Sequence, residues 1–316
     1  MTNAAKGRGN PAAVRRSSGP CLSSSPRDSI AAMTYVEKDR AIGALALAGT
    51  AFLWSLAGLL IKLVDWNPFA IACGRSIVAA VFLLIWIRKP KFTFSMPQVG
   101  AAVASSMTMF LFIYANKATT AANAILLQYG SPIFTAILGA ILLKERPKPE
   151  HWLAFAAVAG GMALFFMGDI GGGSMPGNMA AIAAGVTFAA YFVFMRMQKD
   201  GSPLESNLLA HIITAVIGFV IALFMPAPVF SVKAAMAIGA LGVFQIGLAA
   251  VLLSWGIKRV NAIQGSIIAG LEPVFNPLWV FLALGERPGA NAMAGGAIII
   301  AAVVGSSIVT ARRSRR

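Results

Sequence analysis

Long runs of apolar residues recur along the chain, and short polar segments separate them. The runs 42–61 and 292–309 contain no charged residue. A helix of a soluble domain carries polar residues on its solvent face, so these runs are typical of helices surrounded by lipid. Because the hydrocarbon core of a bilayer is about 30 Å thick, about 20 helical residues cross it. The pattern therefore predicts membrane-spanning helices.

Ten segments have the required length and apolar character. They are residues 42–61, 68–87, 98–116, 120–143, 151–168, 177–195, 206–225, 233–254, 261–284 and 290–310. The first run is longer than the apolar core of a signal peptide and leads directly into further spans, so a cleaved signal peptide is not expected. The sequence thus predicts an all-α, polytopic membrane protein with ten transmembrane helices.

Composition supports this class. Of the 316 residues 58% are hydrophobic and 12% are charged, against about 25% charged in an average soluble domain. Residues 1–40 are rich in Ser, Gly, Pro and Arg, which predicts a disordered cytoplasmic tail. Cys21 and Cys73 form neither a disulfide framework nor a metal-binding spacing. We therefore expect no metal and no cofactor.

The net charge of +15 is distributed unevenly. With ten spans and a cytoplasmic N-terminus, 21 of the 26 basic residues fall on the cytoplasmic side, including the basic C-terminus 311–316. The positive-inside rule then places both termini in the cytoplasm, in a bacterial inner membrane. The charge is explained by topology and by attraction to anionic lipid. Without an aromatic-interleaved basic stripe, no nucleic-acid partner is expected.

The two halves of the chain are similar to each other. Residues 114–147 align with 255–288 at a constant offset, and two clusters match. The matching clusters are Ser131-Pro132-Ile133-Phe134 with Glu272-Pro273-Val274-Phe275, and Glu145-Arg146-Pro147 with Glu286-Arg287-Pro288. Trp54 precedes Lys62 by eight residues, as Phe188 precedes Arg196. The chain is therefore predicted to contain two five-helix units, 41–168 and 177–310, with the second inverted in the membrane.

Taken together, these features resemble the EamA family of the drug/metabolite transporter superfamily. The resemblance covers about residues 41–310 and rests on the duplicated unit, on the aromatic and basic residues of the first helix, and on the Pro-x-Phe and Glu-Arg motifs. It implies a metabolite carrier, often an exporter, whose central cavity is lined by helices one to four of each half. The tail is not part of that pattern.

Several polar residues inside the spans are candidates for substrate binding. Glu272 falls near the centre of the ninth span, where an ionised carboxylate costs about 2.5 to 3.5 kcal/mol, so it should face a cavity, have a partner or be protonated. Asn276 shares its face, and Gln128 and Ser131 form the corresponding face of the fourth span. The functional interpretation is proton coupling or binding of a substrate amine; the alternative is a structural hydrogen bond.

The other candidates for substrate binding lie in five further spans. Arg75 is suited to a carboxylate of the substrate or to Glu272, and His211 lies roughly where the repeat places its counterpart. Trp54, Tyr191 and Gln245 are candidates for the cavity wall. Snorkelling or ordinary packing is the alternative in each case. Pro132 and Pro273 each remove a backbone donor and are candidate hinges.

These observations favour a secondary active transporter, an exporter of a small amphipathic metabolite such as an amino acid or amine, working by alternating access. A passive uniporter or channel-like facilitator is the alternative, followed by a non-transporting scaffold. An enzyme is disfavoured because no catalytic cluster is visible. The fifth and tenth helices contain close-packing glycines, which favour a monomer or a homodimer through these helices. These are Gly160, Gly161, Gly295, Gly296 and Gly305.

Overall fold

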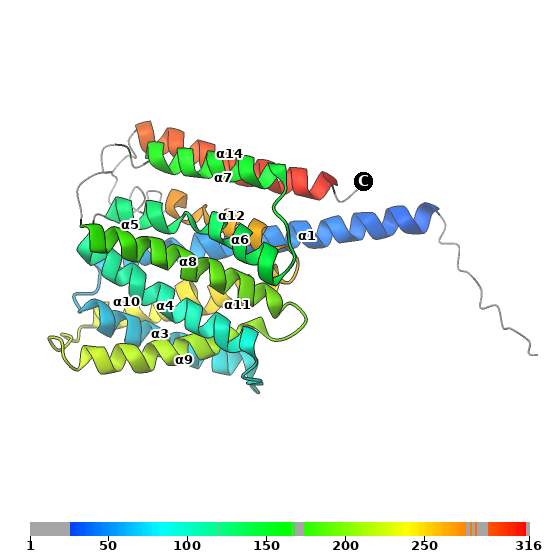
Figure 1. Cartoon of the computed structure of the whole chain (residues 1–316). Helices are drawn as coiled ribbons and strands as arrows, with labels where there is room; N and C mark the ends of the chain where they lie inside the picture. The colour runs from blue at the N-terminus through cyan, green and yellow to red at the C-terminus, as the bar shows by residue number, and fades with distance from the viewer. Residues whose placement is uncertain are drawn as a thin grey trace, which may run out of the picture.

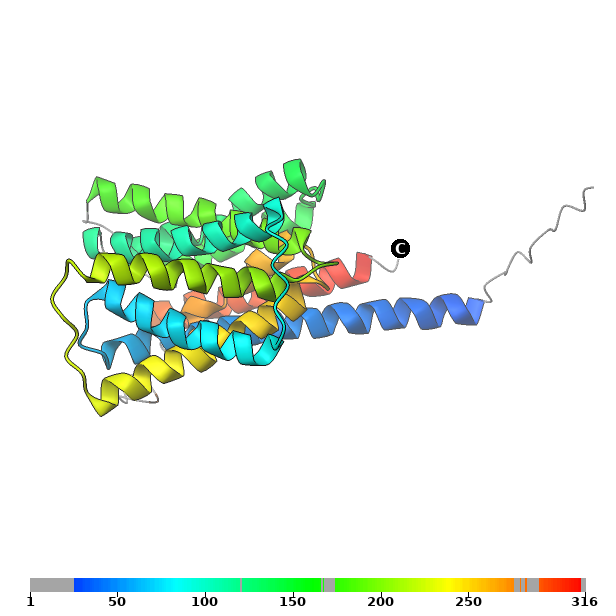
Figure 2. The same cartoon turned by 90° about the horizontal axis from the view of Figure 1, so that it is seen from below.

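The computed structural model describes residues 26–119, 121–165, 167, 174–275, 279, 282 and 290–313. In these residues the regular structure is entirely helical, and the helices lie roughly along one direction in a single bundle (Figures 1 and 2). The elements are α1 (Pro26–Trp54), α2 (Leu56–Lys62), α3 (Pro68–Ile87), α4 (Met96–Ala118), α5 (Ala121–Gln128), α6 (Ser131–Leu142), α7 (Pro149–Phe165), α8 (Met175–Met197), α9 (Pro203–Ala222), α10 (Val232–Ala240), the π-helix η1 (Leu241–Leu248), α11 (Ala249–Ile257), α12 (Ala262–Ala269) and α14 (Ala290–Arg313).

The membrane character predicted from the sequence is confirmed. Seven segments of the described chain are long and apolar enough to cross a bilayer. They are Lys38–Ile61, Pro68–Ile87, Met96–Ala115, Met175–Met197, Pro203–Ala222, Val232–Ile257 and Met293–Thr310. The shorter apolar helices Ser131–Leu142 and Ala262–Phe275 lie where the fourth and ninth spans were predicted.

Those two predicted spans are not continuous helices. The fourth is interrupted at Tyr129 and Gly130, between α5 and α6, and in the ninth a turn follows α12 before residues 272–275 resume the helix. Pro132 and Pro273 each lie in the first turn after the interruption, where a backbone N–H would have no acceptor within the helix. At both positions the regular helical hydrogen bonding is interrupted and then resumes.

α1 begins at Pro26, inside the segment predicted to be a tail. Apolar content indicates which residues lie in the lipid. It does not indicate whether a helix continues beyond the lipid, so this extension of α1 was not predicted. Residues 1–25 lie outside the described part of the chain. At its other end α1 is separated from α2 by Ser55, whose hydroxyl donates to the Phe52 carbonyl at 2.6 Å and accepts from Trp279 Nε1 at 2.7 Å.

Close helix packing at η1 predicts a strong effect of Gly242→Ala. A Cβ on Gly242 would lie 2.4 Å from Val78 Cβ and 2.9 Å from the Arg75 carbonyl oxygen, so α3 and η1 would have to move apart. We expect a loss of about 1 to 3 kcal/mol of stability, measured as a lower melting temperature in detergent. Gly239→Ala is the matched control, because an added Cβ there meets nothing within 4 Å. Equal melting temperatures for the two variants would contradict this account.

Candidate functional site

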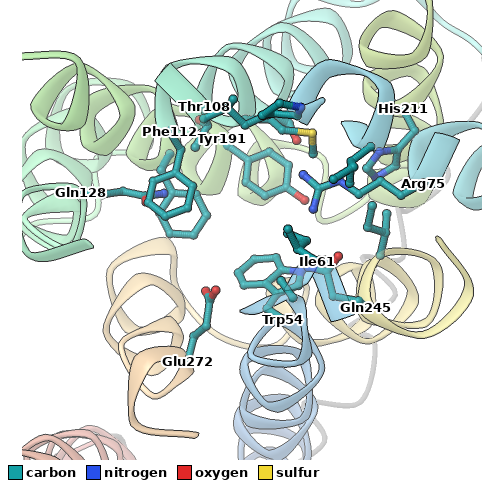
Figure 3. A pocket seen from close by; sticks show the side chains of 18 of the residues that line it. Trp54, Ile61, Arg75, Thr108, Phe112, Gln128, Tyr191, His211, Gln245 and Glu272 are labelled. Carbon is teal, nitrogen blue, oxygen red and sulfur yellow. The ribbon is translucent and has the colours of Figure 1, made fainter. Parts of the chain in front are cut away.

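A cavity of about 660 Å³ lies in the middle of the bundle (Figure 3). The first half of the sequence contributes α1 to α5 to its wall. The second half contributes α8, α9, η1, α11 and residues 272–273. Trp66 and Pro68, in and after the α2–α3 loop, also line it, so the cavity extends toward the end of the bundle opposite the start of α1. Most of the wall is apolar, as in small-molecule sites generally.

Most of the residues predicted from the sequence meet at this cavity. The lining includes Trp54, Arg75, Gln128, Tyr191, His211, Gln245, Glu272 and Pro273. Ser131 and Pro132 do not line it: both are buried in the first turn of α6. Asn276 lies outside the described residues. α6 packs against α8 and α12, and Ser131 is fully buried.

Glu272 has a partner that the sequence did not suggest. Tyr129, in the interruption between α5 and α6, donates its hydroxyl to Glu272 Oε2 at 2.6 Å. Both residues line the cavity. On a continuous helix Tyr129 would be rotated by about 100° from Gln128 and away from the polar face. Tyr129 nevertheless reaches the cavity with its long side chain, and the two interrupted helices meet there through this hydrogen bond.

A second polar group forms the opposite side of the cavity. Arg75 of α3, His211 of α9 and Gln245 of η1 are all buried, and Figure 3 shows them across the cavity from Glu272. Arg75 Nε, His211 Nδ1 and Gln245 Oε1 have no hydrogen-bond partner. π-helical segments such as η1 occur frequently at functional sites. The cavity therefore has an acidic side and a basic side.

Tyr191 and Asn207 connect α8 and α9 at the cavity wall. The Tyr191 hydroxyl donates to Asn207 Oδ1 at 2.5 Å, and Asn207 Nδ2 donates to Ser254 Oγ at 3.3 Å. Trp54 packs against Phe188, with ring centroids 5.8 Å apart. Asn207 was not predicted from the sequence, although it lies four residues before His211 and hence on the same helical face.

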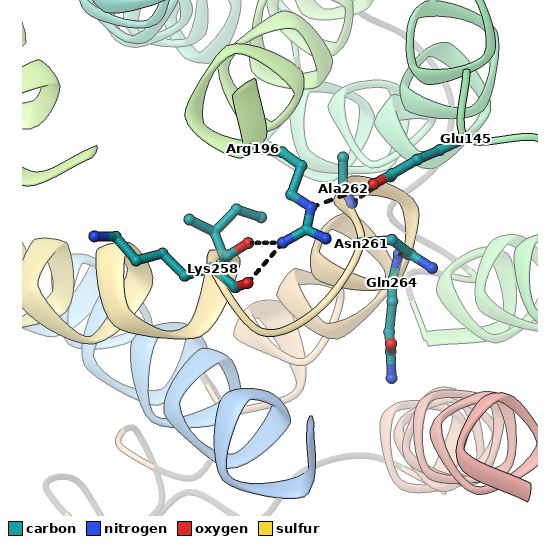
Figure 4. Close-up of polar contacts among 7 residues, drawn as sticks. Glu145, Arg196, Lys258, Asn261, Ala262 and Gln264 are labelled. Carbon is teal, nitrogen blue, oxygen red and sulfur yellow. Dashed lines mark hydrogen bonds and ion pairs between the residues drawn. The ribbon is translucent and has the colours of Figure 1, made fainter. Parts of the chain in front are cut away.

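A polar cluster lies at the end of the bundle toward the start of α1 (Figure 4). Arg196, the last basic residue of α8, donates Nε to Glu145 Oε1 at 3.2 Å. Its Nη1 donates to the carbonyls of Ile257 at 2.9 Å and Lys258 at 2.8 Å. Glu145 Oε2 accepts from the Ala262 N–H at 3.1 Å. We call these contacts the Glu145–Arg196 latch; they join residues near the ends of α6, α8 and α11 to the start of α12.

Within the described residues there is no group of three or more His, Cys, Asp or Glu side chains able to hold a metal ion. The site chemistry available at the cavity is thus one carboxylate, one guanidinium, one imidazole, and amide and hydroxyl groups. This set is suited to binding and proton exchange.

Comparison with known proteins gives consistent matches. A model of the EamA-like transporter family matches residues 41–167 and 175–308. An uncharacterized transporter of Archaeoglobus fulgidus is 26% identical over 278 residues, covering 82% of this chain and 95% of that protein. The uncharacterized transporter YyaM of Bacillus subtilis is 28% identical, covering 62% and 68%. Human solute carrier family 35 member G1 is 28% identical, covering 46% of each chain.

The fold also matches a solved structure. One crystal structure superposes with a TM-score of 0.74 and covers 87% of this chain and 99% of its own, at 20% sequence identity. Identity at this level supports the shared fold alone.

Proposed function

Because this chain belongs to the EamA-like transporter family, we propose that it is a secondary active transporter that exports a small metabolite, such as an amino acid or amine, by alternating access. The observation that carries the proposal is the central cavity, which is lined by helices from both halves of the sequence, with the Glu145–Arg196 latch at the end of the bundle toward the start of α1. Such a site, reached from one end at a time, is what alternating access requires.

The helix boundaries support an inverted repeat of two five-helix units and ten spans. The offset that aligns the two halves by sequence also carries α5 residue for residue onto α12, and the start of α7 onto the start of α14. The α5–α6 interruption and the turn after α12 fall at corresponding positions. α3 and α9 are both 20 residues long and both begin with proline.

Helix packing supports the same arrangement. α3 packs against α9 and α7 against α14, so corresponding helices meet across the pseudo-symmetry axis. α4 packs against α8, and α11 packs against α1. In the repeat α11 corresponds to α4 and α1 corresponds to α8, so these two contacts are equivalent. In this architecture one unit rocks against the other, and Pro132 and Pro273, which follow the two interruptions, are the proposed hinges.

The start of α1 and the end of α14 lie toward the same end of the bundle (Figures 1 and 2). We assign this end to the cytoplasm of a bacterial inner membrane, because it carries most of the basic residues. The structure then corresponds to an outward-facing state, with the latch closing the cytoplasmic side.

The glycines of the outer helices α7 and α14 support either a monomer or a homodimer formed through these helices. Gly161 of α7 packs against Gly295 and Ile299 of α14 within the chain, where an added Cβ would lie within 2.9 Å of each. A Cβ added at Gly160 or Gly305 would meet nothing within 4 Å, so these positions are available to lipid or to a second copy of the chain.

Counterflow in proteoliposomes tests the proposed function. Vesicles preloaded with an unlabelled amino acid or amine should take up the same labelled compound transiently and saturably, and protein-free vesicles should not. A channel-like facilitator would instead give flux that rises without saturation and single-channel current in planar bilayers. Absence of uptake across amino acids, amines and organic acids would contradict transport.

A further inference from the structure

The basic side of the cavity lacks a partner that its chemistry requires. Arg75, His211 and Gln245 are exposed by only 8%, 5% and 8%. Each has a buried polar atom without a hydrogen bond, namely Nε, Nδ1 and Oε1 respectively. Buried polar groups are nearly always satisfied, so three unsatisfied atoms on one cavity wall indicate a place that a ligand completes.

The missing partner of Arg75 is an anion. The two ion pairs found among the described residues are Glu145–Arg196 and Asp39–Arg259, and neither includes Arg75. Glu272 is on the opposite side of the cavity and is hydrogen bonded to Tyr129. An unpaired guanidinium within a membrane bundle is costly, and a bound anion would offset this cost.

The surroundings favour a carboxylate on an apolar body. A guanidinium presents a planar fork that matches the two oxygens of a carboxylate. Gln245 can turn its amide N–H₂ toward the same group, since its two orientations are assigned from hydrogen bonding alone. Most of the remaining cavity wall is apolar and includes Ile61, Ile71 and Trp54. A multiply charged ligand would leave charges unpaired there.

We propose that this cavity binds small organic carboxylates with an apolar body, and that Arg75, with Gln245 and His211 beside it, holds the carboxylate. The inference rests on the proposed role of the cavity as the substrate site. It makes the carboxylate the required group and makes an amine without a carboxylate a poor ligand. An amino group, where present, would lie toward Glu272.

Thermal shift of the purified protein with two matched sets of compounds tests this. The sets are L-leucine, 4-methylpentanoate and 3-methylbutylamine, and L-phenylalanine, 3-phenylpropanoate and 2-phenylethylamine. Within each set the apolar body is nearly constant while the charged groups change. We expect the simple acid of at least one set to raise the melting temperature by about 5 °C at saturation, and the amine of that set to raise it by less than about 1 °C.

Three substitutions, at Arg75 in α3 and at Arg88 just after it, assign the effect to the cavity. Arg75→Gln should remove the shift caused by the acid, whereas Arg88→Gln, which removes the same charge at the exposed end of α3, should preserve it. Arg75→Lys keeps the charge but not the planar fork, so the acid should bind at least tenfold more weakly. If Arg75→Gln does not fold, the contrast between acid and amine in the unmodified protein still decides.

Three results would overturn the inference: no shift with either acid, a shift with an amine equal to that with its acid, or an unchanged acid shift in a folded Arg75→Gln protein. Counterflow separates this failure from failure of the proposed function. Saturable counterflow of an amine alone would leave transport standing while removing the carboxylate site, whereas loss of all counterflow would remove transport itself.

Discussion

Glu272→Gln is expected to abolish the response of transport to a pH gradient. Glutamine keeps the size of the side chain and a hydrogen bond to Tyr129 but cannot release a proton. With one proton exchanged per substrate, a gradient of one pH unit can drive accumulation of about tenfold. Proteoliposomes should show this ratio for the native protein and a ratio of about one for the variant, with the substrate identified by counterflow.

The matched control is Glu205→Gln. Glu205 is a buried carboxylate in the first turn of α9 and does not line the cavity, so its replacement should leave the pH response intact. Gradient-driven accumulation that persists in Glu272→Gln would assign coupling to another group or to none. Loss of counterflow as well as coupling would instead give Glu272 a part in substrate binding.

Breaking the Glu145–Arg196 latch is expected to open the proposed cytoplasmic side of the cavity. Glu145→Gln removes the charge that pairs with Arg196 at 3.2 Å and weakens the cap on the Ala262 N–H. Hydrogen bonds to charged groups contribute about 1.5 to 3 kcal/mol, so the population open on this side should rise about tenfold or more. The substrate cavity itself is unchanged.

Cysteine labelling measures this opening. In a protein with Cys21 and Cys73 replaced, Ile263→Cys places a thiol at a fully buried position one residue beyond the latch contact at Ala262. A membrane-impermeant maleimide added from the side of the termini should react about tenfold faster when Glu145→Gln is present. Asp39→Asn is the control, since it breaks the more exposed Asp39–Arg259 pair at the same end. Equal labelling in both variants would contradict the latch.

The sequence alone determined the membrane class and the family. Apolar runs specify lipid-spanning helices directly, because length and hydrophobicity are local properties of the chain. Neighbouring residues in the sequence also determine several helix boundaries. At the start of α3 the Asn67 side chain accepts a hydrogen bond from the Ala70 N–H, and the following proline fixes the first turn. The resemblance built on Pro132, Pro273 and the Glu-Arg motifs led to the family that the comparisons confirmed.

The tertiary structure decided which side chains meet. Helical spacing predicted Ser131 at the cavity and did not predict Tyr129, whose hydroxyl reaches Glu272 across the cavity from another helix. The latch joins Glu145, Arg196 and Ala262, residues far apart in sequence whose proximity depends on how the two halves pack. Whether a helix is stable in lipid depends on its own composition. Contacts between helices depend on shape and polar pairing across the whole bundle, and a local sequence pattern does not specify them.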